Sequence, residues 1–112
     1  MSLNLSQLAK KAIAKVLIDI ICADGKLTVG EVAYLEQLQN VLEISDADLE
    51  EAQYMSVTGS LSIIRDLPEE IKSAVAFIML EMIQADGEVD EEEMKVFFIV
   101  CAAADIALPE AE

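Results

Sequence analysis

The sequence contains no histidine or tryptophan, and only seven basic residues, four glycines, two prolines and two cysteines among 112 residues. Histidine is the most frequent general base and a usual zinc ligand, so its absence removes the commonest form of both chemistries. Serine, threonine and cysteine side chains have no imidazole to activate them, and the sequence holds no glycine-rich phosphate loop. We predict that the protein is not an enzyme.

The few basic residues face 22 acids, which gives a formal net charge of −15. Such a surface repels nucleic acid and anionic lipid, because phosphate binding depends on clustered lysine and arginine. It suits cations or a basic protein partner, while solubility alone is an alternative explanation of the charge. We expect a protein partner, whose identity the sequence does not give, and no nucleic-acid binding.

Long hydrophobic runs are also missing. The most apolar segment, 74–83, is too short to cross a bilayer and carries Glu81. The lysines at 10, 11 and 15 interrupt the N-terminal apolar pattern, so it does not read as a signal peptide. We expect a cytoplasmic protein without direct membrane insertion. These lysines form a small basic patch that is either solvated or paired with acids of another helix.

The scarcity of glycine and proline leaves little turn material, which favours long helices over many short strands. The two cysteines, Cys22 and Cys101, lie far apart in apolar runs and lack the Cys-x-x-Cys spacing of a redox or metal site. We predict that both are buried, reduced core thiols.

An internal repeat organises the chain. A shift of 62 residues superposes segment 23–31 (ADGKLTVGE) on segment 85–93 (ADGEVDEEE). The match continues upstream into the preceding apolar segments and downstream, where Leu35 aligns with Phe97. A repeat of this kind indicates duplicated supersecondary units.

Each copy encodes a helix end, a tight turn and a new helix. The glycine of Asp-Gly permits the left-handed conformation that ends a helix. Thr28 in copy one and Asp90 in copy two are good N-caps, and Glu31 and Glu93 follow at the capping-box spacing. Each copy is therefore predicted to be an antiparallel helix pair.

We predict an all-α fold: one domain over 1–112, a compact bundle of five to six helices made of two pseudo-repeated helix–ADG–helix hairpins. Repeat one covers about 5–42, connecting helices about 45–67, and repeat two about 68–105. The first helix of each copy is apolar on most faces and should pack centrally. The helices of the two copies are expected at 5–23, 29–42, 69–85 and 91–104. Between the copies, we expect a helix that begins at Asp46 and is capped by Ser45, a break at 57–60, and a short helix at 61–67. Pro68 is expected to be the first residue of the helix that follows.

The two Ala-Asp-Gly-x-hydrophobic-[Thr/Asp]-x-x-Glu motifs, each after an apolar helix, resemble those of the TerB-like family. This family is related to the tellurite-resistance protein TerB and to the N-terminal region of the co-chaperone DjlA. The resemblance spans nearly the whole chain. It implies an acidic helical module, associated with stress response, whose motif acids bind metal cations.

Carried over by position, the motif acids are Asp24, Glu31, Asp86 and Glu93. Asp19 and Glu81, at equivalent places near the ends of the apolar helices, are secondary candidates. Carboxylate oxygens are hard ligands, which favours Ca²⁺ or Mg²⁺.

One observation and one alternative interpretation stand against a cation site. The motif matches only the second half of an EF-hand loop, because the first ligand position falls on Ile20 in copy one and on Met82 in copy two. The alternative is a purely structural, co-chaperone-like interaction module without metal, in which the motif acids act as helix caps.

Overall fold

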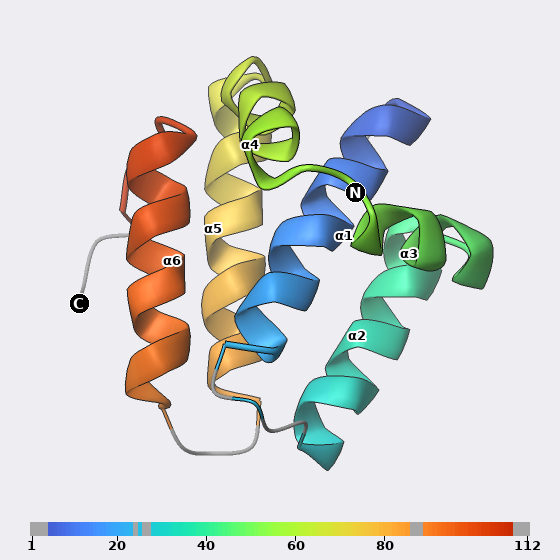
Figure 1. Cartoon of the computed structure of the whole chain (residues 1–112), viewed down its shortest axis with the longest axis vertical. Coiled ribbons are helices and arrows are strands. Elements are labelled where there is room, and N and C mark those ends of the chain that lie inside the picture. The colour runs from blue at the N-terminus through green and yellow to red at the C-terminus, as the bar shows by residue number, and fades with distance from the viewer. Residues whose placement is uncertain (1–4, 24, 26–27, 86–88, 109–112) are drawn as a thin grey trace.

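The computed structural model describes residues 5–23, 25, 28–85 and 89–108, and all regular structure in these ranges is helical. The chain measures 32 × 30 × 29 Å along its principal axes, with a Cα radius of gyration of 12.8 Å. The predicted all-α bundle is confirmed (Figure 1). Its six helices are α1 (Gln7–Ile21), α2 (Val29–Leu42), α3 (Asp46–Gln53), α4 (Val57–Arg65), α5 (Glu69–Ile83) and α6 (Glu91–Ala103).

Side-chain caps fix most helix starts. An oxygen of the N-cap side chain accepts a hydrogen bond from the first-turn backbone at Ser6, Thr28, Ser45, Ser56 and Asp90. Helix α5 has Pro68 at its N-cap, with an extended ψ of 150°. Pro68 therefore precedes the first helical residue, and the prediction that it is that residue is wrong by one position.

The expected break at 57–60 is also misplaced. Helix α3 ends at Gln53 and α4 begins at Val57, so the break lies at 54–56. The cause is Ser56, whose hydroxyl oxygen accepts a hydrogen bond from the Gly59 amide at 2.9 Å. Gly59 thus belongs to a capped first turn rather than to the break.

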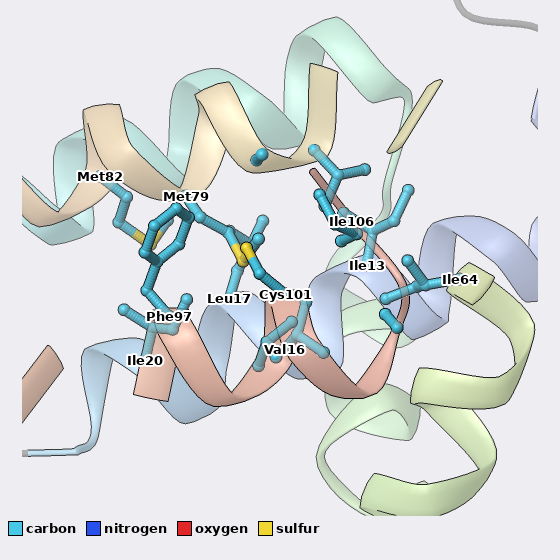
Figure 2. Packing of buried hydrophobic residues seen from close by; sticks show 14 of the residues in the cluster. Ile13, Val16, Leu17, Ile20, Ile64, Met79, Met82, Phe97, Cys101 and Ile106 are labelled. Atoms are coloured by element: carbon cyan, nitrogen blue, oxygen red, sulfur yellow. The ribbon is translucent and has the colours of Figure 1, made fainter. Parts of the chain in front are cut away.

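Helix α1 is the centre of the bundle. It packs against α3, α4, α5 and α6, and its buried face is fully enclosed. Figure 2 shows Leu17 and Ile20 of α1 among the side chains of Met79, Phe97 and Cys101. The expectation of a central position holds for α1, whereas α5 keeps one face in solvent.

The two copies interlock. Helix α2 of copy one packs against α5 of copy two, and α6 of copy two packs against α1 of copy one. Each copy's second helix therefore covers the other copy's first helix. The predicted antiparallel pair is present in copy two, where α6 packs against α5, whereas α1 and α2 of copy one make little contact.

The repeat also includes the end of each second helix. Glu43 after α2 and Asp105 after α6 both adopt the left-handed conformation, with φ of 57° and 56°. The next residues, Ile44 and Ile106, turn back into the core, and each backbone amide donates a hydrogen bond of 2.8 Å to a carbonyl five residues earlier. This is the pattern of a Schellman helix end.

Equivalent lysines hold these helix ends. Lys10 lies 4.0 Å from the Glu43 carboxylate, and Lys72 donates a hydrogen bond of 3.0 Å to the Asp105 carbonyl. The shift of 62 residues relates both pairs. The duplication thus extends beyond the ADG motifs.

The basic patch of α1 pairs with acids of another helix, one of the two alternatives expected. Lys11 forms an ion pair with Glu51 of α3 and lies 4.0 Å from Asp48. Lys15 donates to the Gln53 carbonyl at 3.4 Å. The patch is therefore the surface on which α3 packs.

The two cysteines differ. Cys101 is buried as expected, and burial raises the pKa of its thiol to about 11. Cys22 is exposed, so its predicted burial is wrong. It is the C-cap residue of α1, where the helix passes out of the core after Ile20 and Ile21.

Within the described residues, no helix is long and apolar enough to span a membrane.

Replacing Leu17, which is 1% exposed at the centre of the core, with alanine should lower the unfolding free energy by about 2–5 kcal/mol, because a cavity forms. Urea unfolding measures this. Val41→Ala is the control, since Val41 is 71% exposed and its truncation should change stability by less than about 0.5 kcal/mol. Similar losses in both variants would contradict the central position of α1.

Asp48→Asn should lower the melting temperature at neutral pH. A hydrogen bond from the Ser45 amide is the main cause of the lowered pKa of Asp48, helped by Gln7 at 2.6 Å. A carboxyl with a depressed folded-state pKa stabilises above its unfolded pKa, and this contribution is lost as pH falls through the folded value.

The difference in melting temperature should therefore close as the pH falls below the ordinary value of 3.8. Glu50→Gln, at an exposed position of the same helix, is the control and should show little difference at either pH. A difference between Asp48→Asn and wild type that persists undiminished below pH ~2 would rule out the carboxylate as its source.

Candidate cation-binding site

The two copies present their turns at the same end of the bundle. The C-terminal ends of α1 and α5 and the N-terminal ends of α2 and α6 meet there, at the lower end in Figure 1. Gly25 has the left-handed φ of 74° expected of the first turn. The candidate ligands Asp24 and Asp86 lie outside the described residues.

In copy one, Glu31 closes the predicted capping box. The Thr28 hydroxyl oxygen accepts a hydrogen bond from the Glu31 amide at 3.1 Å. In return, one carboxylate oxygen of Glu31 accepts from the Thr28 amide at 3.2 Å and from the Thr28 hydroxyl at 3.1 Å. Glu31 is only 2% exposed. Its role as a cap is therefore confirmed.

In copy two, Asp90 caps α6. One of its carboxylate oxygens accepts from the Glu92 amide at 2.8 Å and from the Glu93 amide at 3.1 Å. Glu93 is 3% exposed, at the position equivalent to Glu31. The same register thus buries a glutamate in the first turn of both second helices.

The secondary candidates have different surroundings. Asp19 forms an ion pair with Lys15 at 3.1 Å, one helical turn away. Glu81 is exposed and accepts a hydrogen bond from the Tyr34 hydroxyl at 3.1 Å. Although the repeat relates Asp19 to Glu81, the first is engaged within α1 and the second contacts α2.

A groove lies where α2 crosses α5. Its volume is about 460 Å³, and it is lined by Gly30, Ala33, Tyr34, Gln37, Glu81, Gln84 and Ala85. Burial raises the pKa of the Tyr34 hydroxyl, and the hydrogen bond to Glu81 raises it further. Tyr34 is therefore a neutral donor that connects the two copies.

The sequence carries no signal that marks Tyr34. The repeat aligns it with Val96, so the duplication gives no signal for a polar side chain there. Its partner Glu81 was named only as a possible ligand. Only the packing of α2 on α5 brings the two together.

The described acids do not by themselves form a metal cage. Within the described ranges, no three Cys, Asp or Glu side chains group closely enough to hold an ion. The EF-hand positions Ile20 and Met82 are 0% exposed in the core, as the sequence analysis implied for an incomplete loop. Glu31 and Glu93 offer hard oxygen donors, but Ca²⁺ takes six to eight oxygens. Glu31 and Glu93 therefore do not by themselves complete a Ca²⁺ coordination shell.

Comparison with known proteins bears on the fold alone. The crystal structure of the protein of unknown function PG1108 from Porphyromonas gingivalis W83 is similar over 99% of this chain and 90% of that chain, with a TM-score of 0.80 and 23% sequence identity. No protein-family model and no curated protein matches the chain. At this identity the similarity shows a shared helical fold, and function has to be argued from the site.

Thr28→Ala should lower the unfolding free energy by about 1 kcal/mol, because the first-turn amide of α2 loses its acceptor and Glu31 loses a donor. Thr58→Ala is the matched control, since Thr58 is exposed in the first turn of α4 and Ser56 provides the cap there. Denaturant unfolding compares the two. Equal stability of both variants would show that the capping box contributes nothing.

Proposed function

We propose that this protein is a non-enzymatic, acidic, TerB-like helical module that binds a divalent cation, Ca²⁺ or Mg²⁺, at the turn end of its bundle. The observation that supports this most is the pair of first-turn glutamates, Glu31 and Glu93. They are 2% and 3% exposed, occupy equivalent positions, and follow turns at the same end of the bundle.

Electrostatics supports a cation at this end. A buried carboxylate is costly unless hydrogen bonds or positive charge compensate it. In a chain with a net charge of −15, a bound divalent ion relieves repulsion among the acids that follow the turns. Asp24 and Asp86 are the proposed additional ligands.

A structural, co-chaperone-like interaction module is the second candidate function. The capping box favours it, because one oxygen of Glu31 already accepts two hydrogen bonds from Thr28. In that case the acids stabilise α2 and α6, and a protein partner binds another surface. The TerB-like resemblance adds a role in stress response to either proposal.

Thermal unfolding in Ca²⁺ or Mg²⁺ tests the cation proposal. A site filled at 100 times its dissociation constant should add about 2.7 kcal/mol of stability, because the ion binds the folded state. The double variant Asp24→Asn/Asp86→Asn should lose most of this gain. Its stability without metal should stay close to that of wild type, since asparagine preserves the shape of the turn.

The matched control is Glu50→Gln/Asp66→Asn, which removes the same charge from exposed positions of α3 and the end of α4. It should retain the full metal-dependent gain. No gain in wild type at millimolar metal removes the cation proposal. An equal reduction in both double variants assigns the effect to general screening of the acidic surface instead.

A further inference from the structure

Helix α3 covers one face of α1, and the contacts combine ion pairs with an apolar cluster that includes Ala14 of α1 and Ala52 of α3. Lys11 and Lys15 project from that face, and their side chains are only 23% and 13% exposed. Lys11 pairs with Glu51, and Lys15 reaches the Gln53 carbonyl at 3.4 Å. An acidic helix thus packs on a face that carries lysines.

The repeat identifies the same face on α5. A shift of 62 residues carries Lys11 onto Ser73 and Lys15 onto Phe77. Both positions are exposed, and Phe77 is 59% exposed. The helices with substantial packing on α5 in the described chain are α1, α2 and α6, and none takes the place that α3 takes on α1.

This face combines acids with an aromatic residue, and its last acid, Glu81, also accepts the hydrogen bond from Tyr34 of α2. We name it the outer stripe: the exposed α5 residues Glu70, Ser73, Phe77 and Glu81. They are spaced three or four residues apart, so they line one side of the helix.

Helix α6 carries an exposed aromatic side chain at the same level along the bundle. Helices α5 and α6 run antiparallel (Figure 1), Phe77 lies six residues before the end of α5, and Phe97 lies six residues after the start of α6. Phe77 is therefore level with Phe97 and Phe98. Phe97 fills the core, whereas Phe98 is 49% exposed, with its ring centroid 5.5 Å from that of Phe97.

We propose that the outer stripe binds an amphipathic helix of a partner protein that carries lysine or arginine, in the place on α5 that α3 occupies on α1. Its apolar side chains contact Phe77 and Phe98, and its basic side chains pair with Glu70 and Glu81. In the α1–α3 pair the lysines belong to α1 and the acids to α3. In the proposed complex the acids belong to α5 and the basic residues to the partner helix.

Charge selects this occupant over a second copy of the chain. Both copies would carry a net charge of −15, and two outer stripes would oppose Glu70 and Glu81 with like charges. A basic helix removes this repulsion and covers Phe77. Aromatic side chains at the centre of a contact, surrounded by polar groups, are typical binding hot spots.

Binding of a helix at the outer stripe does not depend on binding of a cation at the turn end. The outer stripe shares only Glu81 with the candidate ligands, and Phe77 lies two turns before the end of α5. The test is therefore made in EDTA, where cation binding does not contribute.

The experiment is a titration of the ¹⁵N-labelled full chain with a synthetic amphipathic helical peptide of leucine and lysine, followed by amide chemical shifts. The largest shifts should fall on the outer stripe and around Phe98. Phe77→Lys, which installs the residue of copy one, should weaken binding at least about tenfold, because an anchor is lost and a like charge is added.

Tyr54→Lys is the matched control, since Tyr54 is 82% exposed, lies outside the stripe and undergoes the same change of charge. It should bind as wild type does, and a peptide of the same composition without helical periodicity should bind much more weakly. Thermal unfolding checks that Phe77→Lys is folded. Shifts scattered over the acidic surface, equal affinity for both peptides, or equal weakening by both variants would overturn the proposal.

Discussion

The apolar surface of α1 extends around most of the helix, and four other helices are needed to remove it from water. Its burial therefore sets the arrangement of the whole bundle. Helices α5 and α6 cover it from the second copy, while α3 and α4 cover the face that the duplication leaves open. The two connecting helices are thus part of the core of copy one. Helix α5 has no such cover, which makes the bundle asymmetric despite its repeat.

Local signals in the sequence were sufficient for the fold class and for several boundaries. Helix α2 begins and ends where expected, because Thr28 and Glu31 define its start within four residues. The break before α4 was misjudged because Gly59 resembles a helix breaker, whereas the serine three residues earlier caps the turn. The interlocking of the copies and the contact between Tyr34 and Glu81 depend on tertiary packing, for which the spacing of residues carries no signal. At the candidate site, the capping role of Glu31 followed from its spacing to Thr28, whereas the burial of Glu31 and Glu93 depends on tertiary packing, and Asp24 and Asp86 lie outside the described residues.

The same atoms serve structure and the proposed chemistry at the turn end. An oxygen of Glu31 that accepts hydrogen bonds from Thr28 is partly withdrawn from any ion, since each bond competes for its lone pairs. A cation there would act on the start of α2 as well as on the turn. In copy two the cap is a carboxylate, so the first turn of α6 holds more negative charge than that of α2. The first turns of α2 and α6 would therefore differ in their attraction for a cation.

The packing of α2 of copy one on α5 of copy two bears on how the chain assembles during synthesis. Helix α2 leaves the ribosome directly after α1, but the helix on which it packs, α5, follows only after α3 and α4. Since the chain emerges N-terminus first, the side of α2 that packs on α5 stays without that contact until residues 43–83, more than a third of the chain, have been made. Copy one therefore completes its packing only with residues of copy two, whereas the contacts of α1 with α3 and α4 need no residue of copy two.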